Sequence, residues 1–298
     1  MPTTSDITNM ALFCDFENIA LGVRDAKYAS FDIRRVLERL LLKGSIVVKK
    51  AYCDWERYKE FKAPMHEASF ELIEIPHVRQ SGKNSADIRM VVDALDLCYT
   101  KAHVDTFVII SGDSDFSPLV SKLRENNKHV IGIGVRDSTS DLLAANCDEF
   151  IFYDDLVREQ KQRRRTAEKK TAARAAKETE APKDTAEPAA KSGGRKRGQK
   201  APEKSEAEKN EEARRQEVLD FAVETVEALI QERGGDEKIW GSMVKQTMKR
   251  RRPGFNESAY GYRSFRELIE DAQQRHLLTI TRDDKTGQYT VKVAAGDD

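Results

Sequence analysis

The chain has 298 residues, of which 34% are charged and 39% hydrophobic, with equal numbers of basic and acidic side chains. That length and charge favour two modest domains with a solvated segment over one uniformly packed domain. No apolar run approaches the roughly 18 residues of a membrane span, so we expect a soluble, cytoplasmic protein without a membrane partner. The four cysteines are well separated and no histidine lies beside them at metal-ligand spacing, which argues against a disulfide framework and a structural zinc site.

Charge is distributed unevenly along the chain. Residues 1–156 carry 19 Lys and Arg against 25 Asp and Glu, and residues 217–298 carry 13 against 15. Residues 157–216, in contrast, carry 19 against 11. The basic excess therefore lies in the middle of the chain, where it would attract a polyanion.

The first part of the chain, residues 9–156, alternates short apolar runs with longer amphipathic stretches. This alternation predicts βαβ units and an α/β fold of three layers, with helices on both faces of a mostly parallel sheet. Apolar residues recur at helical spacing near 36–41, 88–95 and 119–123, where we expect helices that contribute to the core. The expected strands are 11–15, 45–52, 71–75, 106–111, 129–135 and 149–153.

The composition changes abruptly after residue 156. Residues 157–213 contain few large apolar side chains and repeat Lys, Arg, Glu and Ala, so they cannot bury enough apolar surface to offset the entropy of ordering them. We expect a flexible basic linker, helical near 160–177. Its segment KSGGRKRGQK is either a solvated tether or a contact to nucleic-acid phosphates.

The last part, residues 214–293, is predicted to be compact again. Apolar residues from 219 to 230 form a helical stripe, residues 242–250 form a second helix, and Ser264 with Glu267 is a capping box that opens a third. The runs LLTITR and QYTVKV flank a turn and predict a hairpin. Three helices and a hairpin are the layout of a small winged helix-turn-helix domain.

An acidic set is the most informative feature of residues 9–156. Asp15 ends the first apolar run, and Asp113 and Asp115 follow the run at 106–111. The carboxyl ends of parallel strands share the sheet edge at which open α/β sheets build their sites. Carboxylates gathered in one cleft repel each other and favour a divalent cation, so we expect Mg²⁺ or Mn²⁺ and hydrolysis of a phosphodiester.

Four further residues accompany this set. Asp87 lies near the start of a helix, where it either caps the helix or points into the cleft. Asn18 can offer an amide oxygen to the metal or a donor to a phosphate. Asp93 is a candidate one step removed from the metal, and Lys83 is a candidate contact to substrate phosphate. A single Asp at a strand-to-helix turn is more commonly a cap, but four acidic positions in one α/β unit favour a metal site.

The motifs FCDFEN, KNSADIRMVVDA, SGDSDFSPLV and STSDLLAANCDEFIFYDDL, in this order, resemble the NYN domain, a branch of the PIN-like metal-dependent ribonucleases. The resemblance covers residues 9–156 and implies a Rossmann-like fold. It also implies a site for Mg²⁺ or Mn²⁺ at the positions that match Asp15, Asp87, Asp113 and Asp115, with Asn18 assisting. This chain has Asn-Ser-Ala before Asp87 where the family often has Gly-Val, which leaves substrate choice open.

The segment KIWGSMVKQTMKRRRPGFNESAYGYRSFRELIEDAQ resembles the OST-HTH domain, also called LOTUS, and this resemblance covers residues 214–293. It implies binding of RNA or of a protein partner. Independently, basic residues cluster in the sequence beside two tyrosines, a composition suited to phosphate contact and base stacking. The alternative is that the tyrosines pack in the core and the basic run only ends a helix favourably. The predicted RNA-binding residues of this part are Lys245, Lys249, Arg250, Arg251, Arg252, Tyr260 and Tyr262.

Taken together, the residues predict an enzyme, a metal-dependent endoribonuclease directed to RNA by its C-terminal module. The alternative is a non-catalytic RNA-binding or adaptor protein that retains the acidic pocket. A HAD-type phosphatase is disfavoured because Asp15 is not followed by the pattern Asp-x-Asp. A dinucleotide dehydrogenase is disfavoured because the glycines at 132 and 134 do not continue into GxGxxG. The sequence leaves the oligomeric state open.

Overall fold

The computed structural model describes residues 8–75, 85–161, 206–234, 237–283 and 288–294. Contacts divide the chain into two units, Met1–Gln160 and Lys161–Asp298, which we call the N-terminal and the C-terminal unit. Most of the predicted linker, residues 162–205, lies outside the described residues. Among the helices in the described ranges, none has both the length and the apolar content needed to cross a bilayer.

The N-terminal unit contains, within its described residues, a sheet of six parallel strands in the order β3-β2-β1-β4-β5-β6. Successive strands are added on one side of β1 and then, from β4 onward, on the other, so the direction of winding reverses between β1 and β4. At such a switch point the connecting loops diverge from neighbouring strand ends and open a crevice. The strands are β1 (Asn9–Asp15), β2 (Ser45–Cys53), β3 (Glu71–Glu74), β4 (Thr106–Ile110), β5 (His129–Gly134) and β6 (Glu149–Phe152).

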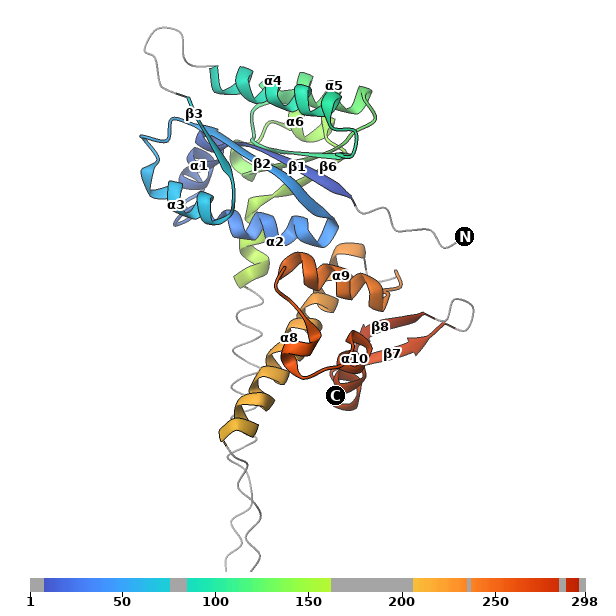
Figure 1. The fold of residues 1–298 in the computed structure, drawn as a ribbon. Coiled ribbons are helices and arrows are strands. Elements are labelled where there is room, and N and C mark those ends of the chain that lie inside the picture. Colours follow the sequence, from blue (N-terminus) through green and yellow to red (C-terminus); the bar gives the residue numbers. More distant parts are fainter. Residues whose placement is uncertain (1–7, 76–84, 162–205, 235–236, 284–287, 295–298) are drawn as a thin grey trace, which may run out of the picture. The chain divides into compact units, whose positions relative to one another are not determined.

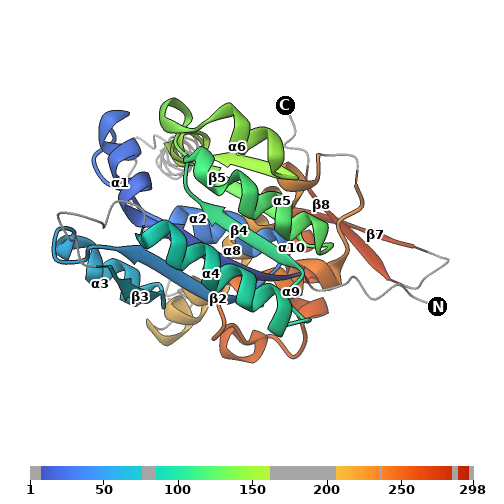
Figure 2. The same cartoon turned by 90° about the horizontal axis from the view of Figure 1, so that it is seen from above.

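Helices cover both faces of this sheet, as Figures 1 and 2 show. Alternate residues of β1 enter different cores: Leu12 packs with residues of α1, α2 and α3, and Phe13 packs with residues of α4, α5 and α6. This two-sided burial explains why the strands are apolar throughout rather than alternating. The helices are α1 (Phe16–Asp25), α2 (Ile33–Lys43), α3 (Lys59–Glu67), α4 (Ser85–Thr100), α5 (Ser117–Glu125) and α6 (Asp141–Asn146), with short 3₁₀ turns η1 (Ser114–Phe116) and η2 (Arg136–Ser138).

The predicted α/β fold with a mostly parallel sheet is confirmed. All six predicted strands are present, with bounds within two residues of those expected, and the three predicted apolar stripes lie in α2, α4 and α5. The expectation that each stripe contributes to the core is wrong for α4, where Ile88 and Val92 are exposed and a different face carries the buried residues. No helix was predicted at α1, α3 or α6. The signal was weak at α3, which has one buried residue, Met65, and contains Pro64 inside the helix. α1 begins at Phe16, with no loop to separate it from β1.

The C-terminal unit has three longer helices, a 3₁₀ turn and an antiparallel hairpin in its described residues, as the pattern predicted. Ser264 accepts a hydrogen bond from the Glu267 N–H at 3.2 Å, and Glu267 accepts one from the Arg263 N–H, so the predicted capping residues do open the third helix. The elements are α8 (Glu206–Arg233), α9 (Gly241–Arg251), η3 (Glu257–Tyr260), α10 (Phe265–Gln274), β7 (Leu278–Arg282) and β8 (Tyr289–Val293).

α8 begins at Glu206, seven residues before the predicted end of the linker at residue 213. Residues 206–213 read EAEKNEEA, a stretch without large apolar side chains but rich in strong helix formers. The Glu211 to Arg215 ion pair, at 2.9 Å and one helical turn apart, adds local support. A prediction based on apolar residues alone therefore misses the polar first turns of α8.

Candidate functional site

Asp15 lies at the junction of β1 and α1 and has two structural roles there. Its Oδ1 accepts a hydrogen bond from the Asn18 N–H at 3.4 Å, which caps α1, and its Oδ2 accepts one from the Ser111 hydroxyl at 3.0 Å. The parallel register pairs Cys14 with Ile110, so the next residue of each strand, Asp15 and Ser111, meet at the sheet edge. Only 8% of Asp15 is exposed. A carboxylate is therefore held, nearly buried, at the switch point.

The turn after β4 is joined to α1 by a second bond. Asn18 Oδ1 accepts a hydrogen bond from the Gly112 N–H at 2.9 Å. The Ser111 hydroxyl oxygen accepts one from the Asp113 N–H, and Asp113 Oδ1 in turn accepts one from the Asp115 N–H at 3.0 Å. Asn18 thus fixes the turn that carries Asp113. Its amide oxygen is already engaged, so its NH₂ group is the part left to donate to a ligand.

Gly112 allows a third segment to approach this turn. A Cβ added at Gly112 would lie 2.4 Å from the Ser138 carbonyl oxygen, in the loop after β5. The same loop donates the Ser140 N–H to the Gly112 carbonyl oxygen at 2.9 Å. The start of α1 and the loops that follow β4 and β5 are therefore tied together at one point, which only a residue without a side chain permits.

A pocket of about 310 Å³ lies beside these loops. Asp87, in the first turn of α4, lines it as well, and so does Tyr52 of β2. Among the described residues that line the pocket, none is Lys, Arg or His. The carboxylates that line it are those of Asp15, Glu17, Asp54, Asp87 and Asp113.

Burial and mutual repulsion change the acidity of this pocket. Burial, and then the nearby charge of Asp87, raise the pKa of Asp15 to about 7, although the bonds from Asn18 and Ser111 act to lower it. Burial raises the pKa of Asp87 to about 6, with further contributions from Asp113 and Asp115. Arg57 pairs with Glu17, but no described basic side chain lines the pocket to compensate the charges of Asp15 and Asp87.

The predicted ligand set is not assembled as expected. Within the described residues, no three His, Cys, Asp or Glu side chains lie close enough together to hold a metal ion. Repulsion among carboxylates, recorded in the raised pKa of Asp15 and of Asp87, opposes a tighter cluster. The chemistry of the donors nevertheless fits Mg²⁺ or Mn²⁺, because the charged donors in the pocket are all carboxylate oxygens. The carboxylates are therefore the right type of ligand, but they would have to move closer together to bind the cation.

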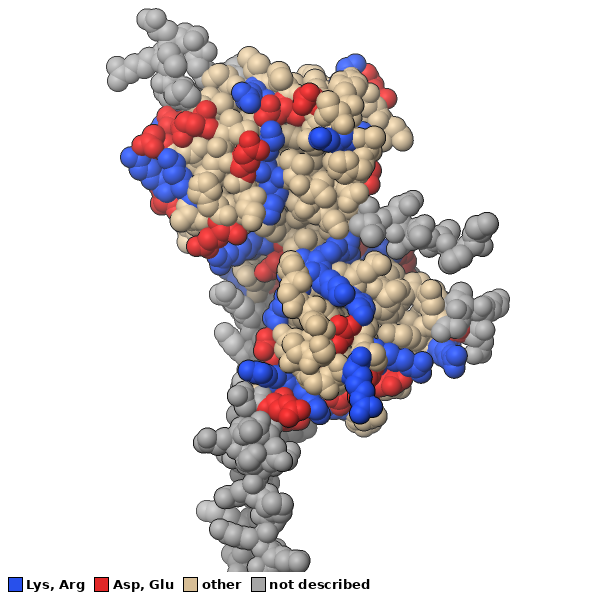
Figure 3. Space-filling model, in the orientation of Figure 1, with Lys and Arg blue, Asp and Glu red and all other residues tan. Residues whose placement is uncertain are grey.

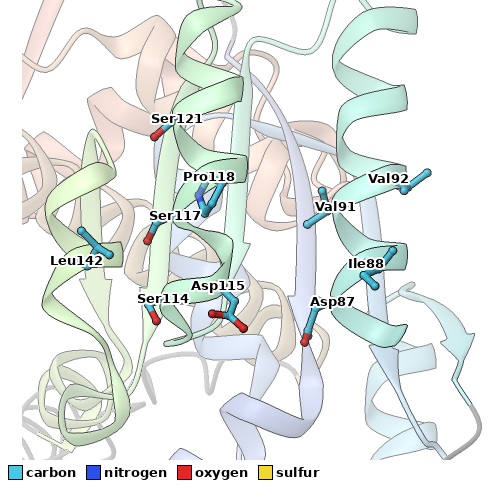
Figure 4. Close-up of a pocket in the computed structure, with 10 residues that line it drawn as sticks. All are labelled: Asp87, Ile88, Val91, Val92, Ser114, Asp115, Ser117, Pro118, Ser121 and Leu142. Atoms are coloured by element: carbon cyan, nitrogen blue, oxygen red, sulfur yellow. The ribbon is translucent and has the colours of Figure 1, made fainter. Parts of the chain in front are cut away.

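Asp115 is separated from Asp15 and Asp113. It lines a neighbouring groove between α4, α5 and α6, whereas Asp15 and Asp113 line the acidic pocket, and Asp87 borders both (Figure 4). The pattern Asp-x-Asp placed Asp113 and Asp115 together in sequence, but η1 turns the chain between them so that Asp115 is exposed on the groove side.

Asp93, predicted to assist, is placed differently from the main set. Asp93 accepts hydrogen bonds from the Tyr52 hydroxyl at 2.9 Å and from Lys50 Nζ at 3.2 Å. Burial alone would raise the pKa of Asp93, but these bonds hold the pKa below its usual value. Asp93 therefore acts on the pocket through Tyr52, which lines it. Lys83 lies outside the described residues.

Sequence reasoning missed three contributors to the pocket. Ser111 bonds to Asp15, and Asp54 lines the pocket directly after β2. The rule that selected Asp15, a polar residue at the carboxyl end of a buried strand, applies equally to both and would have found them. Glu17 also lines the pocket, and it pairs with Arg57 at 3.2 Å.

The basic run of the C-terminal unit is largely held by acidic and aromatic partners of the same unit. Arg251 pairs with Glu224 at 2.6 Å, and Arg252 lies over the Phe221 ring at 4.1 Å. Lys245 pairs with Glu257 at 2.5 Å. The face of this unit visible in Figure 3 correspondingly shows basic side chains interspersed with acidic ones. Several of the basic side chains in this run thus already have partners within the unit.

Individual residues of the predicted RNA surface differ in exposure. Lys249 is exposed, Tyr260 is half-buried against Phe255, and Arg250 donates a hydrogen bond to the Thr247 hydroxyl at 2.9 Å. Arg251 has only 10% of its side chain exposed. Arg251 therefore offers little surface for the RNA contact that the sequence predicted.

Tyr262 is a core residue, contrary to the expected stacking role. Its exposed fraction is 4%, and its hydroxyl donates to Asp271 Oδ2 at 2.5 Å. Burial, and then that bond, raise the pKa of Tyr262. A ring enclosed on both faces cannot stack on a base, so the alternative that placed this tyrosine in the core is the correct one.

Comparison with known families supports the prediction for the first unit. Residues 9–154 match the model of the NYN domain family. The N-terminal unit carries an NYN domain. The match confirms the predicted family to within two residues of its C-terminal bound, and it implies a PIN-like nuclease fold. The OST-HTH identity of the C-terminal unit stays a prediction.

Two similar proteins show how this chain compares with individual proteins. An uncharacterized protein of Methanocaldococcus jannaschii is 27% identical over 125 residues, which are 42% of this chain and 49% of that protein. The chain thus spans about half the length of this curated relative. A protein of unknown function from Vibrio parahaemolyticus has a crystal structure with 26% identity and a TM-score of 0.46, covering 51% of this chain and 97% of that one.

The acidity of Asp15 gives the first prediction. Its pKa of about 7 in the folded NYN domain exceeds the ordinary value of 3.8, so ionisation destabilises the fold as pH rises from about 4 to 7. We expect Asp15→Asn to raise the free energy of unfolding by about 2–4 kcal/mol at pH 8 in the presence of a chelator, and to bring no gain near pH 4. Chemical denaturation at the two pH values measures this difference.

Asp96→Asn, an exposed change on α4, is the matched control and should alter stability little at either pH. An equal loss of stability at both pH values in Asp15→Asn would contradict the electrostatic explanation and leave only the loss of hydrogen bonds.

Proposed function

We propose that this chain is a metal-dependent endoribonuclease and that its NYN domain hydrolyses RNA phosphodiester bonds. The observation that carries the proposal is the acidic pocket at the β1/β4 switch point, where Asp15, Asp87 and Asp113 lie without a described basic residue among the lining. Burial and neighbouring carboxylates raise the pKa of Asp15 and of Asp87, and for Asp15 they do so despite two hydrogen bonds that act to lower it; such raised pKa values are typical of a functional site. The PIN-like nuclease fold of the NYN family supports the same reaction class.

The roles of the residues follow from their positions. Asp15, Asp87 and Asp113 would hold Mg²⁺ or Mn²⁺, and the chemistry supplied by such a cation is activation of water and neutralisation of phosphate charge. Asn18, with its oxygen engaged by Gly112, would donate from its NH₂ group to a phosphate oxygen. Ser111 orients the carboxylate of Asp15. No covalent nucleophile of the protein is required.

Within this proposal, the C-terminal unit raises the local concentration of RNA near the NYN domain. Its three helices and hairpin are consistent with a winged-helix module of the OST-HTH type, and its exposed Lys249 offers a phosphate contact. Because most of the basic run is paired within the unit, we expect a small number of phosphate contacts and modest affinity. A protein partner of this unit is the alternative to RNA.

One observation favours the second candidate function, a non-catalytic RNA-binding or adaptor protein. No three potential metal ligands lie together in the described residues. A domain that retains carboxylates but does not close them around a cation would bind RNA without cleaving it. Cleavage assays separate the two functions directly.

The second prediction concerns activity. End-labelled single-stranded RNA incubated with the purified chain and Mn²⁺ should be cleaved, and Asp15→Asn or Asp113→Asn should lower the rate at least 100-fold because each removes a charge that holds the cation. Gel analysis of the products with and without a chelator measures the effect.

Asp96→Asn should cleave at the rate of the unaltered chain, since this carboxylate is exposed on α4 and does not line the pocket. If neither Asp15→Asn nor Asp113→Asn slows a chelator-sensitive cleavage, the proposed site is wrong. If the unaltered chain binds RNA but never cleaves it, the adaptor function is correct.

The third prediction separates surface from core in the C-terminal unit. Lys249→Ala should weaken RNA binding and reduce the slope of log affinity against log salt by about 0.7, the value for one phosphate contact to a single strand. Tyr262→Phe should leave RNA affinity unchanged and lower the stability of the unit by about 0.5–1.5 kcal/mol, because it removes one buried hydrogen bond to Asp271. Binding titrations at several salt concentrations and thermal unfolding measure the two effects.

An unchanged salt slope in Lys249→Ala would remove this lysine from the RNA surface. A loss of RNA affinity in Tyr262→Phe without a loss of stability would restore the tyrosine to it.

A further inference from the structure

The groove beside the acidic pocket has a composition unlike the rest of the surface. It has a volume of about 670 Å³ and is bordered by α4, by the first turn of α5 and by Leu142 of α6 (Figure 4). Five large hydrophobic side chains are exposed in the described residues, and three of them, Ile88, Val92 and Leu142, line this groove. Their exposed fractions are 63%, 55% and 58%. Such a concentration of exposed apolar surface marks a binding site.

Polar groups in the groove lack partners. Ser117 is 6% exposed, and its hydroxyl has no hydrogen-bond partner within the described part of the chain. Figure 4 shows this hydroxyl on the side of α5 that faces Leu142. Ser114 and Ser121 line the same groove, and the Asp115 carboxylate has no ion pair or hydrogen bond in the described residues. The Ser117 hydroxyl has almost no accessible surface, so the polar groups left for a ligand are the hydroxyls of Ser114 and Ser121 and the carboxylate of Asp115.

The groove and the acidic pocket are adjacent, because Asp87 lines both. A ligand whose phosphate reaches Asp87 from the acidic pocket would therefore place its neighbouring group in the groove. The described residues that line the groove include no Lys or Arg, so they do not favour a phosphate there. The apolar walls suit instead a flat, uncharged ring, and the hydroxyls and the carboxylate suit hydrogen-bond donors on its edge.

We propose that this groove binds an unpaired nucleobase of the RNA substrate, next to the phosphodiester at the acidic pocket, and that Asp115 selects bases that carry an amino group. The proposal rests on the proposed function for its substrate. The base lies between the apolar side chains of α4 and Leu142, over Pro118. A base in a duplex cannot enter a groove of this kind without leaving its stack, so the substrate strand is single-stranded at this position.

The selectivity follows from the chemistry of a carboxylate, which only accepts hydrogen bonds when ionised. The exocyclic amino group of cytosine donates to such an acceptor, whereas uracil presents a carbonyl oxygen at the same position. Asp115 therefore attracts cytosine and repels uracil. Serine hydroxyls donate or accept and do not discriminate between the two bases. An asparagine at this position would offer both a donor and an acceptor.

The experiment uses the full chain with Asp15→Asn, so that RNA is not consumed, and measures binding of labelled tetracytidylate and tetrauridylate by fluorescence anisotropy. We expect tetracytidylate to bind about 5- to 10-fold more tightly, in the range of one good base contact. Adding Asp115→Asn should bring the ratio of the two affinities close to one. Adding Ile88→Gln should weaken binding of both, while Val47→Gln, an exposed apolar residue on β2 outside the groove, should change neither.

Photocrosslinking of a 5-bromocytidine oligonucleotide to the same chain locates the base. Crosslinks within residues 85–92, 114–121 or 141–146 support the groove, and crosslinks confined to the C-terminal unit overturn it. A base ratio unaffected by Asp115→Asn also overturns it. A basic, apolar peptide serves as a competitor. If this peptide crosslinks to the same segments, and free cytidine and uridine do not displace the oligonucleotide whereas the peptide does, the groove is a protein-docking surface and the proposal is wrong.

The two proposals fail separately. If the unaltered chain does not cleave RNA but shows the Asp115-dependent base ratio, the proposed nuclease function is wrong and the groove stands. If it cleaves RNA in a metal-dependent manner but Ile88→Gln and Val47→Gln behave alike, the nuclease function stands and the groove does not bind a base.

Discussion

One buried carboxylate organises the carboxyl edge of the N-terminal sheet. Asp15 caps α1, receives the Ser111 hydroxyl across the β1/β4 boundary, and lies close enough to Asp87 for repulsion between them to raise its pKa. Burying an acid is costly, and the two hydrogen bonds only partly offset that cost. Binding of a cation or of a proton at Asp15 is therefore more favourable than leaving the carboxylate ionised and alone. The ionised carboxylate lowers the stability of the fold, as residues of functional sites commonly do.

Much of the fold could be predicted because its pattern is local. Strands buried on both faces are continuous apolar runs, and Asp15 and Asp113 stand directly after two of them, so the shared sheet edge follows from parallel topology alone. The separation of Asp115 from Asp113 could not be predicted, because it depends on one turn of 3₁₀ helix. Nor could the engagement of the Asn18 oxygen by Gly112, which is a contact between residues 94 positions apart.

In the C-terminal unit, the elements could be predicted from the sequence but the roles of individual side chains could not. Its elements could be located from capping residues and turn chemistry, yet the roles of its basic and aromatic residues depend on packing. Arg251 lies over Phe221, and Tyr262 donates to Asp271, so residues that resemble a nucleic-acid surface in sequence are part of the core or its margin. Composition indicates which side chains a segment has, and only the fold decides which of them face outward.

The site is built from parts of unequal rigidity. Asp15 and Asp113 belong to loops joined by hydrogen bonds and by the close approach at Gly112, whereas Asp87 is carried by the first turn of α4, whose neighbouring side chains Ile88 and Val92 face solvent. Substitutions on the exposed face of α4 can therefore change the residues that border the acidic pocket with little cost to the sheet edge. The same separation makes α4 the natural starting point for redesigning the specificity of this domain.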